Sequence, residues 1–171
     1  FEDWCQGGVL VISLAKDLDI WFHIGSLILK ISDEKSGQKL ANRAFLISPE
    51  GQVVARYDKL HLFDVDLPNG ERYRESRLYK PGEKAVMAET AIGNFGLSIC
   101  YDLRFANLYR KLATAGASIL LVPAAFTVKT GEAHWHTLLK ARAIETGSFI
   151  MVAAQTGRPE TGPGPDKHMT P

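Results

Sequence analysis

Cys100 ends a short apolar stretch, FGLSIC, and polar and charged residues follow it at once. In an extended chain Phe95, Leu97 and Ile99 lie on one side, which predicts a buried strand. Beyond Cys100 the apolar residues recur at helical spacing, so we expect the thiol at a turn between a strand and a helix. Backbone N–H groups at such a turn stabilise a thiolate, which is a strong nucleophile. An inert thiol in the core is the alternative, because cysteine is among the residues most commonly buried.

Three charged residues are candidates to act with this thiol. Lys59 follows an apolar, strand-like run and opens a charged stretch without clear periodicity, residues 58–78, in which Glu75 lies. Irregular stretches of this length inside a compact domain are usually functional or disordered. Arg104 follows Cys100 by about one helical turn, which pairs a guanidinium with a thiolate. For Lys59 and Glu75 the alternative is an ordinary solvated position on the surface.

The histidines allow a different chemistry, in which the thiol acts with His61 or His134 in a protease or an acyltransferase. This interpretation explains fewer of the candidate residues. His134 and His136 are two residues apart, so on a helix they point in different directions and cannot share a metal ion. The two cysteines, Cys5 and Cys100, lack the CxxC spacing of a metal site. We therefore expect no metal and no cofactor.

Composition and charge restrict the class of protein. The chain has 171 residues, of which 46% are apolar and 23% are charged, the profile of one soluble globular domain. Its net charge of +1 gives no field of one sign, so we expect neither nucleic acid nor a membrane as a partner. No apolar run reaches transmembrane length. Two distant cysteines do not form a disulfide framework, so the cytoplasm is the expected compartment.

Periodicity predicts one mixed α/β domain over residues 1–157 and a disordered Pro/Gly-rich tail over residues 158–171. Right-handed crossovers would place its two later helices on one face of a mixed sheet. The predicted elements are, in chain order, a helix or strand over residues 9–17, a strand over 20–31 interrupted at Gly25, a hairpin over 43–57, paired strands over 85–90 and 95–100, a helix after Cys100 that ends at Gly116, a strand over 118–122 stopped by Pro123, a helix over 132–146 with Thr130 as its N-cap, and a strand over 149–154.

Five blocks follow one another in the order NRAFLISPEGQVVARYDKLHLFDVD, YRES, GLSICYDLRF, LVPAAFTVKTGEAHWHTLLKARAIET and FIMVAAQTG. Together with the strand that precedes them, these blocks resemble the nitrilase superfamily of carbon–nitrogen hydrolases over about residues 20–157. The chain is most similar to the Nit-type amidases, a branch that includes deaminated-glutathione amidases and omega-amidases. The resemblance implies an α-β-β-α sandwich, a homodimer of the full-length protein and a small-molecule amide as substrate.

The resemblance also implies a Glu–Lys–Cys triad. By motif, Cys100 is the nucleophile, Lys59 is the triad lysine and Glu75 is a further loop glutamate beside the triad. A thiolate attacks the carboxamide carbonyl, ammonia leaves, and water hydrolyses the thioester. The Lys59 ammonium and the backbone N–H of Tyr101 would bind the oxyanion.

A pocket around these groups is implied at the end of the strand that follows. Arg104 would bind a carboxylate of the substrate in a bidentate manner. Its alternative is an ion pair with Asp102 or Glu75. The residues expected to line the pocket with Arg104 are Ala125, Phe126 and Thr127.

The sequence departs from the family at both ends. The general-base glutamate of the family ends a strand upstream of the matching blocks, and Glu2, the only nearby candidate, is too close to the strand over residues 20–31. We interpret this base as absent. After the last block the family continues into further strands, whereas this chain runs into GRPETGPGPDKHMTP. The chain therefore resembles the central part of a longer enzyme, and a catalytically inactive fragment or interaction module of the same fold is the alternative function.

Overall fold

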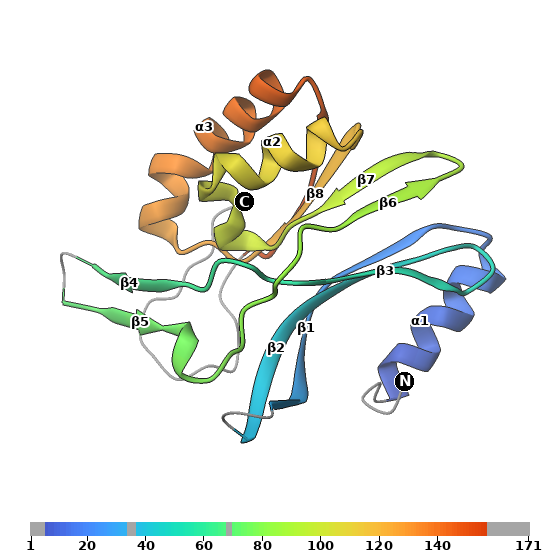
Figure 1. Cartoon of the computed structure of the whole chain (residues 1–171), viewed down its shortest axis with the longest axis horizontal. Coiled ribbons are helices and arrows are strands. Elements are labelled where there is room, and N and C mark those ends of the chain that lie inside the picture. The colour runs from blue at the N-terminus through green and yellow to red at the C-terminus, as the bar shows by residue number, and fades with distance from the viewer. Residues whose placement is uncertain (1–5, 34–36, 68–69, 157–171) are drawn as a thin grey trace. The chain divides into compact units, whose positions relative to one another are not determined.

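The computed structural model describes residues 6–33, 37–67 and 70–156, and the chain divides into two compact units, residues 1–88 and 89–171 (Figure 1). The first unit contains α1 (Gln6–Asp17), β1 (Phe22–Asp33), β2 (Gly37–Ile47), β3 (Val53–Asp58), β4 (Asp64–Asp66), β5 (Arg72–Arg74) and the 3-10 helix η1 (Glu75–Arg77). The division falls within β6 (Met87–Thr90), and the second unit continues with β7 (Gly93–Leu97), the 3-10 helix η2 (Cys100–Arg104), α2 (Ala106–Thr114), β8 (Ile119–Ala124), α3 (Val128–Thr146) and β9 (Phe149–Ala154).

The mixed α/β class predicted from the sequence is confirmed by this order of elements. A single domain over residues 1–157 stays a prediction. The tail predicted over residues 158–171 lies outside the described residues.

An antiparallel sheet in the order β1-β2-β3 organises the first unit. The central strand β2 pairs with both neighbours, and its Phe45 and Ile47 are fully buried. The hairpin predicted over residues 43–57 is confirmed. Its turn contains Gly51, where φ is +72° and a Cβ would overlap the Lys16 side chain of α1. Glycine is favoured there by the backbone conformation, because a residue with a Cβ is strained at this φ.

Two further predictions for the first unit concern its N-terminal part. The stretch over residues 9–17, for which helix and strand were both open, is part of helix α1. The pairing of β1 with β2 shifts register between Ile24 and Leu27. Gly25 lies within this irregularity, so the predicted interruption of the strand is confirmed.

The second unit is a sheet in the order β6-β7-β8-β9, in which β7, β8 and β9 are parallel. Helices α2 and α3 connect the parallel strands, and Figure 1 shows both on the same face of this sheet, as predicted. On the face that carries α2, the buried side chains of Leu120 in β8 and Leu112 in α2 both pack against Gly96 of β7.

Strand β8 extends beyond its predicted end, because it passes through Pro123 to Ala124. The residue pairing between β7 and β8 ends at Leu97 and Leu121. The missing N–H of Pro123 therefore interrupts no hydrogen bond to β7, and the proline is tolerated inside the strand.

Helix α3 begins one turn earlier than predicted, with Thr127 and not Thr130 as its N-cap. The Thr130 Oγ1 lies 2.7 Å from the Thr127 Oγ1, and the N–H of Gly131 donates to the Thr127 carbonyl at 2.8 Å. Gly131 is thus part of the first turn. The prediction of Thr130 was wrong because Thr127, three residues earlier, is an equally suitable residue type for an N-cap.

Candidate active site

Lys59 follows β3 directly, and its side chain is buried in the first unit with 4% of its surface exposed. Its Nζ donates to Glu75 Oε2 at 2.6 Å, and the same oxygen accepts the backbone N–H of Phe63 at 2.6 Å. A buried ammonium is stable only with such a partner, so the two side chains hold each other in place. The structure thus brings together two residues that the sequence singled out.

The stretch that presents Glu75 contains three short regular elements, in contrast to the irregular loop predicted over residues 58–78. Strands β4 and β5 form a hairpin in which Asp64 pairs with Arg74, and η1 begins at Glu75. The guanidinium of Arg74 donates to both carboxylate oxygens of Asp66, at 2.6 and 2.8 Å. The prediction was wrong because strands of three residues are too short to show a period.

The backbone of Lys59 is fixed from two sides. Its N–H donates to the carbonyl of Asn42 at 2.9 Å, and its carbonyl accepts the N–H of Gly82 at 2.9 Å. A Cβ at Gly82 would overlap the carbonyl oxygen of Asp58. Only glycine lets the two backbones approach so closely, so Gly82 helps to position the lysine.

Cys100 lies in the second unit, after β7 has ended and where η2 begins. The predicted position of the thiol between a strand and a helix is confirmed. Its φ is +50°, a left-handed conformation that is uncommon for residues other than glycine and recurs at functional turns. The Sγ is half-buried and lies 3.8 Å from the carbonyl oxygen of Ala125. A strand-to-helix turn of this kind also presents the nucleophilic serine of α/β-hydrolases.

Two reciprocal hydrogen bonds close the turn around Cys100. The N–H of Asp102 donates to the carbonyl of Ile99 at 3.1 Å, and the N–H of Ile99 donates to Asp102 Oδ2 at 2.9 Å. Asp102 is fully buried. The sequence pattern suggests Asp102 only as an ion-pair partner of Arg104, although an acidic residue at the third helical position is a known capping signal.

Buried polar side chains form hydrogen bonds next to this turn. The Ser98 Oγ lies 2.8 Å from the Tyr109 hydroxyl and donates to the Leu121 carbonyl at 2.8 Å. Burial raises the pKa of Tyr109, so its hydroxyl stays protonated. Arg142 of α3 is also buried; its Nε donates to the Leu103 carbonyl at 3.0 Å, and its Cζ lies 5.5 Å from the ring centroid of Tyr109.

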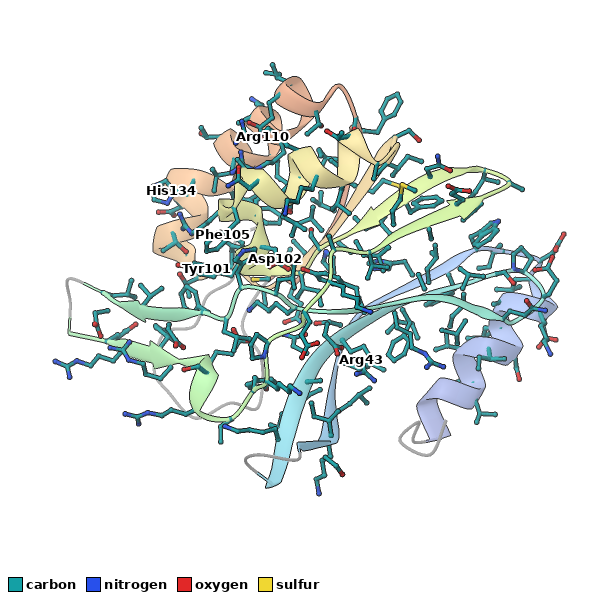
Figure 2. The ribbon with its side chains drawn as sticks, viewed as in Figure 1. Arg43, Tyr101, Asp102, Phe105, Arg110 and His134 are labelled. Carbon is teal, nitrogen blue, oxygen red and sulfur yellow. The ribbon has the colours of Figure 1, made fainter. Side chains whose placement is uncertain are left out.

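Arg104 lies among aromatic rings and a histidine. Its Cζ is 5.9 Å from the ring centroids of both Tyr101 and Phe126, and its Nη2 is 3.3 Å from His134 Nδ1. Figure 2 labels two of these neighbours, Tyr101 of η2 and His134 of α3. The structure therefore places Arg104 beside Tyr101 and Phe126, which the sequence predicted with it around a pocket, and beside His134, which the sequence suggested only for other chemistry.

The other predicted site residues take different positions. Ala125 is exposed and offers its carbonyl to Cys100, whereas Thr127 caps α3. His136 is exposed. Among residues 6–33, 37–67 and 70–156, no group of three or more histidine, cysteine or acidic side chains is arranged to hold a metal ion. In the same part of the chain no helix has the length and apolar character needed to cross a membrane.

The family model for carbon–nitrogen hydrolases matches residues 10–167, so the chain belongs to this family. The chain is 47% identical over 149 residues to the deaminated glutathione amidase of Yersinia enterocolitica, and the aligned region covers 86% of this chain and 51% of that protein. It is 45% identical over 155 residues to the deaminated glutathione amidase of Dictyostelium discoideum, and the aligned region covers 89% of this chain and 53% of that protein. The chain thus spans about half the length of these curated relatives.

Solved structures confirm the predicted nitrilase-type α/β fold. The NitFhit protein of C. elegans matches with a TM-score of 0.83 and 38% identity, over 96% of this chain and 39% of that chain. A variant of the amidase from Nesterenkonia sp. AN1 matches with a TM-score of 0.70 and 27% identity, over 88% of this chain and 52% of that chain. That amidase shows covalent addition of the acetamide moiety of fluoroacetamide at its active site cysteine.

Proposed function

We propose that this chain supplies the nucleophile and the oxyanion-binding lysine of an amidase that acts on a small, carboxylate-bearing amide. The observation that carries the proposal is the thiol of Cys100, which stands at a left-handed strand-to-helix turn within the residues that match the carbon–nitrogen hydrolase family. A strained conformation of this kind persists only where the surrounding structure maintains it, as it does at catalytic sites. The covalent adduct at the active site cysteine of the Nesterenkonia amidase supports a covalent mechanism.

In the proposed reaction the Cys100 thiolate attacks the carbonyl carbon, and negative charge moves to the oxygen as the C–S bond forms. The N–H of Tyr101 and the ammonium of Lys59 would bind this oxyanion, each lowering the barrier by about 2.7–4 kcal/mol. The intermediate then collapses to a thioester as the C–N bond breaks, and the nitrogen takes up a proton and leaves as ammonia. Water attacks the thioester, breaks the C–S bond and restores the thiolate.

Both halves of this reaction need a carboxylate that transfers protons. Glu75 already accepts hydrogen bonds from Lys59 and from the N–H of Phe63, so we propose that its role is to orient the lysine. The general-base glutamate of the family has no counterpart that we identify in this sequence. For this reason a catalytically inactive module of the same fold is the second candidate function.

Arg104 and the names of the relatives support the proposed substrate class. Arginine binds carboxylates in a bidentate manner, and the rings of Tyr101 and Phe126 restrict the guanidinium. Because the relatives are named deaminated glutathione amidases, we propose the amide of a deaminated glutathione as the substrate. The omega-amidase substrate 2-oxoglutaramate also carries a carboxylate and is the comparison compound.

Ammonia release from the two amides tests the proposal. We expect release above the background rate, a loss of at least about 100-fold in Cys100→Ala and in Lys59→Arg, and no change in Cys5→Ala, which removes the other thiol. Unchanged release in Cys100→Ala would refute the assignment of the nucleophile. No release from the unmodified chain would favour the inactive module.

The homodimer of the full-length protein and the cytoplasmic location stay predictions from the resemblance. Light scattering on the full-length protein tests the first, since a dimer has twice the mass of the full-length monomer.

A further inference from the structure

The turn that presents Cys100 is closed by a single fully buried carboxylate. Asp102 has no exposed surface, and it bonds Ile99 twice, once through its backbone N–H and once through its Oδ2. Cys100 and Tyr101 lie between the two ends of this closure. The residue that would attack the substrate and the N–H that would bind the oxyanion are therefore held by one residue, through its backbone and its side chain.

We propose that Asp102 is a positioning residue, which keeps Cys100 in its left-handed conformation and so aims both the thiol and the Tyr101 N–H. The proposal rests on the proposed function, in which these two groups act on the substrate. A residue with a Cβ is strained at a φ of +50°, so the turn needs an external constraint to stay there. The bond from the Ile99 N–H to a carboxylate oxygen supplies that constraint, since bonds to charged acceptors are stronger than neutral ones.

Burial of the carboxylate supports a role beyond packing. An ionised side chain inside a protein is unfavourable unless hydrogen bonds and charges compensate it, and an apolar residue would fill the same space without that penalty. The next residue, Leu103, is tied to α3, because its carbonyl accepts a hydrogen bond from the buried guanidinium of Arg142. The turn is thus fixed on its strand side by Asp102 and on its helix side by Arg142.

Alkylation of Cys100 by iodoacetamide tests the proposal without requiring amide turnover. The rate is measured as a function of pH in Asp102→Ala and Asp102→Asn, and peptide mass mapping separates Cys100 from Cys5. The matched control is Ser148→Ala, which removes another buried hydrogen bond of the second unit, from the Ser148 Oγ to the Ala117 carbonyl at 2.9 Å. Urea unfolding of each variant reports its stability.

We expect the rate at its high-pH plateau to fall about 10-fold to 100-fold in Asp102→Ala, because misplacement of a reacting group by an ångström has effects of that size. Asp102→Asn should stay within about threefold of the unmodified chain, since its amide oxygen can still accept the Ile99 N–H. Ser148→Ala should lose stability but keep its alkylation rate. A rate in Asp102→Ala equal to that in Ser148→Ala would overturn the proposal.

If Asp102→Ala does not fold, Asp102→Glu serves instead, because it keeps the charge but displaces the carboxylate by one methylene. A reduced plateau in this variant supports the proposal, and an unchanged plateau refutes it. The two hypotheses fail separately. Absent ammonia release with an Asp102-dependent alkylation rate contradicts only the amidase, whereas normal release with an Asp102-independent alkylation rate contradicts only the positioning role.

Discussion

Replacing Glu75 by leucine should destabilise the first unit more than replacing Lys59 by methionine, although both changes break the same ion pair. In Glu75→Leu the Lys59 ammonium loses its carboxylate partner while its side chain is only 4% exposed to water. The N–H of Phe63 loses the same acceptor. An uncompensated buried charge costs about 3–5 kcal/mol. Without Lys59, the Glu75 carboxylate keeps the Phe63 N–H at 2.6 Å and is 14% exposed to water, so the loss should be about 1.5–3 kcal/mol.

A double-mutant cycle separates the pair from its surroundings. Lys59→Met with Glu75→Leu removes both charges, so its cost should be lower than the sum of the single costs by about 1–3 kcal/mol. Urea unfolding followed by circular dichroism gives the free energies of unfolding, and hydrogen exchange over residues 53–80 localises the change to this unit. The control is the cycle on Arg74 and Asp66, whose side chains are 32% and 62% exposed and should couple by about 0.2–1 kcal/mol. Equal costs of the two single changes, or additive costs in the double variant, would refute this reasoning.

Three further predictions concern single residues. Burial lowers the pKa of His23 to about 4, so between about pH 6.5 and pH 4 the unfolded chain binds a proton that the folded chain does not. The free energy of unfolding should therefore decrease by about 3 kcal/mol as the pH falls through that range, and urea unfolding of His23→Gln should lack this part of the slope; an equal slope would contradict the effect of burial. Cys100→Val should be less stable than Cys100→Ala by about 1–3 kcal/mol, since a β-branched residue fits a φ of +50° poorly, and equal thermal unfolding would argue against that conformation. Gly82→Ala should cost about 1–3 kcal/mol in urea unfolding because its Cβ overlaps the Asp58 carbonyl; a loss below about 0.5 kcal/mol would show that the segment can move aside.

The elements that periodicity predicted well are those long enough to repeat their pattern. The hairpin over residues 43–57 and the parallel strands with their crossover helices are confirmed. The position of Cys100 between strand and helix also follows from a change of period that the sequence shows directly. These features depend on local pattern and on chain connectivity, which one sequence contains.

The features that could not be predicted depend on contacts between distant positions. Nothing local distinguishes the buried pair of Lys59 and Glu75 from two solvated charges, because the pairing depends on the hairpin that separates them. The bonds between Asp102 and Ile99 are local, and they were missed because the sequence pattern suggested this aspartate only as an ion-pair partner of Arg104. Arg104 and His134 meet only because η2 and α3 pack together, and their chain separation of 30 residues hides this.

Pro123 of β8 lies beside the place where the chain leaves the neighbouring strand, β7, toward Cys100. In a parallel sheet, alternate residues direct their backbone N–H and C=O groups to opposite neighbouring strands. Leu121 and Pro123 therefore both face the side of β7. The carbonyl of Leu121 accepts the N–H of Ser98, just after β7, at 3.1 Å. A residue with an N–H at position 123 would direct that donor to the same side, beyond Leu97, the last residue of β7. Proline has no such donor. A proline inside an apolar strand can therefore mark, in a sequence alone, the place where the adjacent strand turns out of the sheet.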